Sequence, residues 1–221
     1  MDTVLIVAPH PDDETLGCGG TILKHRSLGD NVNWLVVTRS QGFRETRTDT
    51  DTQQKEILQV AKAYGFDSVT HLNFEASKLD IAPMSELVFS IKKVIDEIQP
   101  TIIYVPYWND VHSDHRCVFD ATISASKWFR SPSIKEIYAY ETLSETNFAG
   151  HGGVFRPNVY INIEQFFEKK VDILRIYESQ IAAHPFPRGV ETVEALAKIR
   201  GSESGVGHAE AFILIKKIDR A

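Results

Sequence analysis

The side chains most suited to chemistry lie near the start of the sequence, in the string Ala8-Pro9-His10-Pro11-Asp12-Asp13-Glu14. This first string carries one imidazole and three carboxyl groups, and it directly follows the apolar, β-branched run 4–7. Carboxylates held this close together repel one another, and a divalent cation that also binds the imidazole offsets the repulsion. The first string therefore predicts one half of a catalytic metal site.

A second string of histidines and aspartates occurs farther along the chain, Asp110-Val111-His112-Ser113-Asp114-His115. It follows another apolar run, residues 102–105. In an open parallel sheet, ligands bind beyond the carboxyl ends of the strands, where the strand order reverses. If the two apolar runs are neighbouring strands at that point, the two strings face each other and form one site.

Together the two strings contain the groups needed for metal-assisted hydrolysis of an amide or ester. A catalytic zinc ion takes three protein ligands and keeps one position for water. Here His10, one carboxylate of residues 12–14, and either His112 or His115 would supply the ligands. A remaining carboxylate can act as general base, and a spare imidazole can stabilise an oxyanion or protonate a leaving amine. Spacing alone does not decide which aspartate binds the metal.

The elements that must position these strings alternate between strand and helix. Hydrophobic patterning predicts strands over 3–9, 32–39, 69–74, from 101 onward, 136–143, 159–163 and 211–215. It predicts helices over 13–29, 52–64, 85–98, 116–129, 164–179 and 190–200, with irregular polar stretches at 40–51 and 144–157. The alternation predicts an α/β fold, a Rossmann-like three-layer sandwich whose central sheet is largely parallel.

Size and composition limit the possible classes of protein. A chain of 221 residues that is 43% hydrophobic predicts a single domain, residues 1–221, with a sizeable core. The net charge of −6 argues against a nucleic-acid partner. No apolar run approaches a membrane span and the N-terminus lacks the basic segment of a signal peptide, so we expect a cytoplasmic protein. Cys18 and Cys117 are too few for a disulfide scaffold, and packing is favoured over metal binding for both.

The two strings also resemble the signatures of a known family. Residues 9–14, followed by Leu16-Gly17-Cys18-Gly19-Gly20-Thr21, closely resemble the opening of the LmbE/PIG-L family of zinc-dependent sugar deacetylases. Residues 110–115 look like the second signature of that family, and residues 200–201 and 209–212 are similar to its C-terminal part. The resemblance implies removal of an acetyl group from an N-acetylated amino sugar, one Zn²⁺ per active site, and assembly into a homo-oligomer.

The resemblance further implies a role for each polar residue of the strings. The implied zinc ligands are His10, Asp13 and His115. Asp12 would then be the general base, and His112 would stabilise the tetrahedral oxyanion or act as an acid. Asp114 would orient His112.

Substrate recognition is where the sequence departs from the family. Many members carry an arginine early in the helix after the second strand, and the best match here is Gln53. We expect substrate contacts from Arg44 in the adjacent loop, from Asp110 in the second string and from His208 near the C-terminus. Trp108, beside the second string, is equally suited to stacking on a sugar ring and to packing in the core.

Two other function classes share parts of this pattern. Two histidines and one carboxylate also describe the metal site of non-haem iron(II) oxygenases, but that alternative predicts an all-β, cupin-like strand pattern. A non-catalytic sugar-binding module would have a broken metal set or a missing base, and both strings are complete. The glycines at 17, 19 and 20 do not form a dinucleotide loop, because Ile22 stands where a third glycine is needed.

Overall fold

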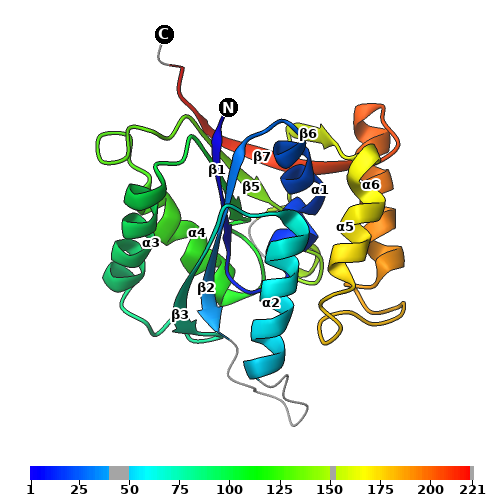
Figure 1. Ribbon diagram of the computed structural model, residues 1–221, viewed down its shortest axis with the longest axis horizontal. Helices are drawn as coiled ribbons and strands as arrows, with labels where there is room; N and C mark the ends of the chain where they lie inside the picture. The colour runs from blue at the N-terminus through cyan, green and yellow to red at the C-terminus, as the bar shows by residue number, and fades with distance from the viewer. Residues whose placement is uncertain (40–49, 150–152, 220–221) are drawn as a thin grey trace.

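The computed structural model describes residues 1–39, 50–149 and 153–219, whose strands form one sheet with helices on both faces (Figure 1). The strands are β1 (Thr3–Ala8), β2 (Asn31–Arg39), β3 (Ser68–Glu75), β4 (Ile102–Pro106), β5 (Glu136–Tyr140), β6 (Val159–Asn162) and β7 (Ala209–Lys217). The helices are α1 (Asp13–Ser27), α2 (Thr50–Tyr64), α3 (Met84–Ile98), α4 (Ser113–Ala125), α5 (Phe167–Leu174) and α6 (Val190–Ser204). Two short 3₁₀ helices are η1 (Thr146–Phe148) and η2 (Glu164–Phe166).

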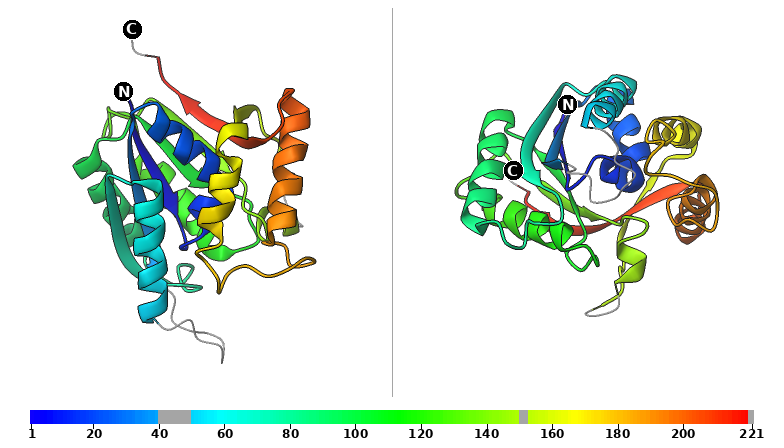
Figure 2. Two further views of the ribbon diagram at one scale, coloured as in Figure 1. Left: turned by 45° about the vertical axis from the view of Figure 1, so that its right-hand side comes forward. Right: turned by 90° about the horizontal axis from the view of Figure 1, so that it is seen from below.

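Within the described residues, the seven strands follow the order β3-β2-β1-β4-β5-β7-β6. The five strands from β3 to β5 in this order run parallel to one another, whereas β7 runs antiparallel to both β5 and β6. Helices α3 and α4 cover one face of the sheet, and α1 and α2 cover the other, with α5 and α6 beside α1 (Figures 1 and 2). The predicted α/β architecture with a largely parallel sheet is confirmed.

Strand β1 supplies side chains to the cores on both faces of the sheet, because successive residues of a strand point in opposite directions. Val4 and Ile6 pack in the core beneath α1 and α2, and Leu5 and Val7 pack in the core beneath α3 and α4. All four side chains are fully buried. This burial fixes the position from which the first string leaves the sheet.

The two strings meet because the strand order reverses between β1 and β4. These strands are direct neighbours, with Ile6 opposite Tyr104 in the parallel register. The chain turns from β1 into α1 on one face and from β4 into α4 on the other, so the two connections diverge and open a crevice between them. The predicted side-by-side arrangement of the two strings is confirmed.

The predicted helices differ from the observed ones in their limits, and for two of them the structure shows the reason. Helix α4 begins at Ser113 rather than at 116, because the His112 ring caps it by accepting a hydrogen bond from the Asp114 N–H. The predicted helix 164–179 is instead η2 followed by α5, which ends at Leu174. The chain leaves the helix there because Tyr177 turns inward, where its hydroxyl donates to the buried Glu14.

The glycines of α1 allow close packing against its neighbours. A Cβ added to Gly20 would lie 2.6 Å from Cβ of Ile163, and one added to Gly17 would overlap the ring of Tyr140. At both positions α1 lies closer to its neighbours than a side chain would permit. The close approach of α1 to Ile163 and Tyr140 therefore requires glycine at these two positions.

A buried ion pair also fastens α1 to the rest of the fold. Glu210 of β7 accepts hydrogen bonds from the Gly20 and Thr21 N–H groups, both at 2.8 Å. Lys170 of α5 donates to Glu210 Oε1 at 2.7 Å and to the Leu16 carbonyl at 3.0 Å. Both charged residues are almost completely buried. A buried charge that loses its partner is costly, so this pair should matter for stability.

Replacing Lys170 by methionine should lower the free energy of unfolding by about 3–5 kcal/mol, because Glu210 would remain buried without its cation. Urea unfolding followed by circular dichroism measures the change. Lys198→Met is the matched control, since Lys198 pairs with Glu194 on an exposed helix surface and should change stability by no more than about 0.5 kcal/mol. Equal effects of the two substitutions would contradict this role of Lys170.

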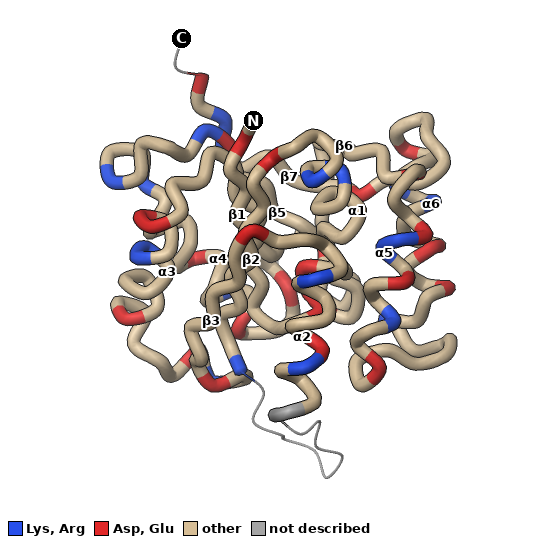
Figure 3. The backbone as a smooth tube through the Cα atoms, viewed as in Figure 1, with Lys and Arg blue, Asp and Glu red and all other residues tan. Residues whose placement is uncertain are grey.

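Charged residues of both signs are distributed along the backbone of the helices and loops in the view of Figure 3. No concentrated stretch of lysine and arginine marks one part of the described chain in that view. Among the described residues, no helix has the length and apolar character that crossing a membrane requires.

Candidate metal centre

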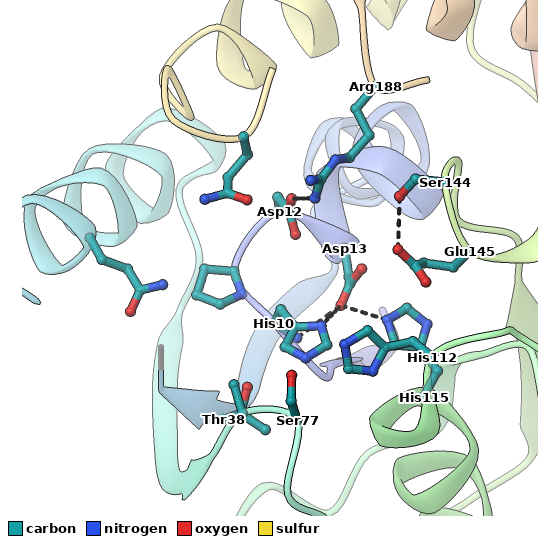
Figure 4. A pocket seen from close by; sticks show the side chains of 14 residues that line it. His10, Asp12, Asp13, Thr38, Ser77, His112, His115, Ser144, Glu145 and Arg188 are labelled. Atoms are coloured by element: carbon teal, nitrogen blue, oxygen red, sulfur yellow. Dashed lines mark hydrogen bonds and ion pairs between the residues drawn. The ribbon is translucent and has the colours of Figure 1, made fainter. Parts of the chain in front are cut away.

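A cavity of about 230 Å³ opens at the carboxyl edge of the sheet, where the two strings meet (Figure 4). His10, Asp12 and Asp13 line it from the connection between β1 and α1, and His112 and His115 line it from the start of α4. Other walls come from the ends of β2 and β3, from the segment after β5 and from the segment between α5 and α6. These five residues of the two strings therefore share one cavity.

Three side chains converge on one point in this cavity. His10 Nδ1 lies 3.2 Å from Asp13 Oδ2, and His115 Nε2 lies 3.3 Å from the same oxygen. One ligand atom from each of the three residues falls within 4.8 Å of the other two. His115 Nε2 is buried and makes no hydrogen bond to any described residue. A buried lone pair beside a carboxylate is well suited to a metal cation.

The outer nitrogen of His10, which is the ring nitrogen that faces away from Asp13, is held by a buried carboxylate. His10 Nε2 lies 3.0 Å from Asp114 Oδ2, and Asp114 also accepts hydrogen bonds from the N–H groups of Ser77 and Leu79. Burial opposes the charge on Asp114, but the bonds from His10 and Ser77 lower its pKa. An ionised carboxylate only accepts, so His10 Nε2 carries a proton, and Nδ1, which faces Asp13, is the nitrogen left to bind a cation once it loses its own proton.

The outer nitrogen of His115 is held in the same way by Asp110. His115 Nδ1 donates to Asp110 Oδ2 at 2.8 Å, and the Thr146 hydroxyl donates to Asp110 Oδ1 at 2.6 Å. Both carboxylate oxygens are thus occupied, and Asp110 is only 1% exposed. The Asp110 side chain faces His115 and is not among the residues that line the cavity, so the structure does not bring it to the position that the predicted substrate contact needs.

The hydrogen bonds of the outer nitrogens favour one combination of ligands over another. His10, His112 and Asp114 also bring their ligand atoms within 4.8 Å of one another. In that set, however, the Asp114 carboxylate already accepts three hydrogen bonds and His112 Nδ1 already accepts one. In the set His10, Asp13 and His115, both imidazoles direct a lone pair at the same carboxylate oxygen. This set best fits a metal cation.

The pKa values of the same three residues are shifted from their ordinary values. Burial opposes a charge on His10, but its hydrogen bonds to Asp114 and Asp13 raise its pKa to about 9. Burial likewise opposes charge on His115 and Asp13, but their mutual attraction raises the pKa of His115 and lowers that of Asp13. The site therefore attracts positive charge, and protons compete with a metal cation for these lone pairs.

Asp12 occupies an unusual position next to this site. Its backbone has φ 120° and ψ −29°, a conformation that residues with a side chain rarely adopt. The Asp12 N–H donates to Glu14 Oε2 at 3.0 Å, and Arg188 Nη1 donates to Asp12 Oδ2 at 2.9 Å. Burial and the neighbouring Asp13 carboxylate raise the pKa of Asp12 to about 7, against the opposing effect of Arg188. Such a carboxyl group can both accept and release a proton near neutrality.

His112 presents an N–H donor to the cavity. Its Nδ1 accepts a hydrogen bond from the Asp114 N–H at 3.1 Å, so a neutral ring carries its proton on Nε2. Burial and the charges of His10 and His115 lower the pKa of His112 to about 4. The contact of Asp114 with His112 is therefore made by the backbone N–H of Asp114 and not by its carboxylate. That carboxylate lies 4.0 Å from His112 Nδ1 and binds His10 instead.

The other predicted substrate contacts have separate outcomes. Gln53 lines the cavity, whereas Arg44 lies outside the described residues. The ring of His208 stacks on Phe167 of α5, with 4.3 Å between centroids, and His208 is not among the cavity-lining residues. It precedes β7, which lies two strands away from β4. Trp108 contacts Tyr107 and is not among the cavity-lining residues.

Two charged residues of the cavity were missed by sequence reasoning. Arg188 pairs with Asp12, and Glu145 follows β5 and lines the wall near the histidines (Figure 4). Each is a single charged residue in an irregular segment, without a neighbouring string of ligand-type residues. The two cysteines pack as predicted, Cys18 in the core beneath α1 and Cys117 against the core beneath α4.

Residues 5–126 match the family model of PIG-L, described as GlcNAc-PI de-N-acetylase. This chain belongs to the PIG-L family. The matched residues include both strings and therefore every member of the candidate metal site. The family resemblance inferred from the sequence is confirmed.

Individual relatives of this PIG-L family member carry the similarity over most of the chain. A probable N-acetyl-alpha-D-glucosaminyl L-malate deacetylase 2 of Bacillus cereus is 28% identical, over 81% of this chain and 84% of the relative. The diacetylchitobiose deacetylase of Thermococcus kodakarensis is 26% identical, over 97% of this chain and 84% of the relative. The crystal structure of the conserved protein TT1542 from Thermus thermophilus is 25% identical, with a TM-score of 0.81 over 100% of this chain and 98% of that one.

Replacing Asp110 by asparagine should weaken metal binding by about 10–100-fold, because the carboxylate that orients His115 loses its charge. Titration of the protein with Zn²⁺ in competition with a chromophoric chelator measures the affinity. Asp120→Asn on α4, the helix that carries His115, is the matched control, because Asp120 belongs to neither group of candidate metal ligands. An unchanged zinc affinity for Asp110→Asn would contradict the orienting role.

Proposed function

We propose that this PIG-L family protein is a zinc-dependent deacetylase that hydrolyses the N-acetyl amide of an amino sugar or sugar conjugate. One observation carries the proposal: His10 Nδ1 and His115 Nε2 converge on Asp13 Oδ2 in a cavity that also contains Asp12 and His112. Two curated relatives named as deacetylases of N-acetylated sugars support it. The α/β fold removes support for the iron(II) oxygenase alternative, which predicts an all-β pattern.

The residues divide the reaction between them. His10, Asp13 and His115 would hold the ion, and bound Zn²⁺ would supply the activation of water and the polarisation of the acetyl carbonyl. Asp12 accepts the proton of the attacking water, because its carboxylate lies beside the ligands and has a pKa near neutrality. His112 Nε2–H donates to the acetyl oxygen, where negative charge develops. Asp12 then releases its proton to the leaving nitrogen, which gives acetate and a free amine.

The size of the cavity limits how much of the substrate enters. Its volume of about 230 Å³ is below the roughly 300–1,000 Å³ of pockets that enclose a drug-sized ligand. The N-acetyl group and the adjoining part of one sugar ring would occupy it, and the remainder of a conjugate would lie outside. The substrate is therefore proposed to be an N-acetylglucosamine unit with a variable attached group.

The test is acetate release by the purified, zinc-loaded protein. Three substrates sample the attached group: free N-acetylglucosamine, N-acetylglucosaminyl malate and diacetylchitobiose. We expect zinc-dependent acetate release from at least one of them, lost on chelation and restored by added Zn²⁺. No acetate release from any of the three, by protein whose zinc content is verified, would contradict the proposal.

The cytoplasmic location, the homo-oligomeric state and the single-domain organisation stay predictions.

A further inference from the structure

The segment between α5 and α6, residues 175–189, reaches Asp12 from two directions. Arg188 Nη1 donates to Asp12 Oδ2 at 2.9 Å, which is a contact with the side chain. The Tyr177 hydroxyl donates to Glu14 Oε1 at 2.8 Å, and the other oxygen of Glu14 accepts from the Asp12 N–H at 3.0 Å. The same segment therefore contacts the side chain of Asp12 directly and its backbone through Glu14.

The backbone of Asp12 requires such support. A residue with a side chain held in a sparsely populated conformation costs about 1–3 kcal/mol, and it persists only where its surroundings determine it strongly. At Asp12, with φ 120°, the carbonyl accepts from the N–H groups of Thr15 and Leu16 at 3.0 and 2.9 Å. These two bonds belong to the first turn of α1, so they hold the carbonyl only. The N–H side is held by Glu14.

The anchor on Glu14 is fully enclosed. Glu14 is 0% exposed and Tyr177 is 1% exposed. The Thr15 hydroxyl also donates to Glu14 Oε1 at 2.6 Å, and the Tyr64 hydroxyl donates to Thr15 at 3.0 Å. Hydrogen bonds to a carboxylate in a low-dielectric interior are strong and fix geometry closely. None of Glu14, Thr15, Tyr64 or Tyr177 belongs to the proposed ligand set, so this network is free to act on Asp12.

The anchor on the side chain lies at the wall of the cavity. Arg188 is above Asp12 in Figure 4, on the side away from the three histidines. Its guanidinium binds Oδ2 and so distinguishes the two carboxylate oxygens of Asp12. A group fixed in this way meets the attacking water in one orientation, and misplacement by about 1 Å can cost about 100-fold in rate.

We propose that segment 175–189 is a positioning element for Asp12: Arg188 fixes its carboxylate, and Tyr177, acting through Glu14, fixes its backbone. The proposal rests on the proposed function, because it takes Asp12 as the general base. Both residues lie outside residues 5–126, the part of the chain that the family model matches. The family match therefore does not cover the positioning element.

The test compares Arg188→Met and Tyr177→Phe with the wild-type protein. The matched control is Arg175→Met, because Arg175 lies at the start of the same segment and pairs with Asp172 on the surface. We expect Arg188→Met to lower kcat by about 100-fold and Tyr177→Phe to lower it by about 10-fold, with KM and zinc content close to wild type. Added ethylguanidinium should restore part of the kcat of Arg188→Ala, whereas it should not affect Arg175→Ala.

A crystal structure of each variant provides a readout that does not depend on activity. We expect the Asp12 carboxylate to turn in Arg188→Met and the Asp12 φ to change in Tyr177→Phe. Unchanged geometry of Asp12 in both variants would overturn the proposal, whatever the rates. A raised KM with unchanged kcat in Arg188→Met would also overturn it, since Arg188 would then bind substrate. Wild-type protein that releases no acetate would instead contradict the proposed function, and the crystal structures would still decide the positioning.

Discussion

Replacing Asp12 by asparagine should lower kcat for acetate release by about 10²–10⁴-fold, while the protein keeps its zinc. An asparagine oxygen can still accept the hydrogen bond from Arg188, so the side chain should remain in place. The carboxamide cannot take up a proton from water, however, and the proposed mechanism stops at its first step. Zinc content by mass spectrometry and the rate of acetate release measure the two halves of this expectation.

The control for this substitution is Asp172→Asn, which removes an exposed carboxylate that pairs with Arg175 on the surface. It should leave both the rate and the zinc content unchanged. Near-normal turnover by Asp12→Asn would exclude Asp12 as the base. A loss of zinc from Asp12→Asn would instead make Asp12 a metal ligand and would require a new assignment of Asp13.

Replacing His115 by alanine should abolish both zinc retention and acetate release. His115 Nε2 is a buried nitrogen beside Asp13 Oδ2, and removing this side chain leaves two candidate ligands in place of three. Zinc affinity should fall by more than the roughly 10–100-fold expected when a ligand loses only the group that hydrogen-bonds to its other nitrogen. Zinc content after exhaustive dialysis is the direct measurement.

His208→Ala is the matched control for the loss of a histidine, because the His208 ring stacks on Phe167 away from the cavity. It should retain zinc and activity. Urea unfolding of both variants should accompany the assay, because His115→Ala leaves the Asp110 carboxylate buried without its main partner. Full zinc occupancy of folded His115→Ala would remove His115 from the ligand set and with it the proposed site.

The sequence predicted the parts of the molecule that rest on local patterns. Residues 4–7 and 102–105 are apolar runs that directly precede the two strings, so the elements and their polar ends could be recognised together. The reversal of strand order between β1 and β4 then followed from the general behaviour of parallel sheets. For this reason the cavity and the convergence of His10, Asp13 and His115 agree with expectation.

Long-range contacts could not be predicted in this way. Tyr177 and Glu14 are 163 residues apart, and Arg188 and Asp12 are 176 residues apart. No periodic pattern or cluster of ligand-type residues connects such pairs. The early end of α5 has the same origin, because the inward turn of Tyr177 depends on a partner in α1.

The sequence also could not predict the direction in which each side chain of the second string points. Asp110 and Asp114 are both aspartates close to a histidine, and either could be expected to face substrate. Their roles depend on the point at which α4 begins, since Asp114 lies in its first turn whereas Asp110 precedes it. The cap formed by His112 sets that point. Because the sequence predicts a helix start at 116 and the helix begins at Ser113, the different roles of Asp110 and Asp114 could not be predicted.

The position of His112 at the start of α4 has a consequence for the response of the protein to alkali. The partial positive charge at a helix N-terminus disfavours an imidazolium cation, in agreement with the pKa of about 4 for this ring. A ring that is already uncharged donates its N–H without first gaining a proton. Any decline of the hydrolytic rate on the basic limb of a pH–rate profile must therefore arise from another group.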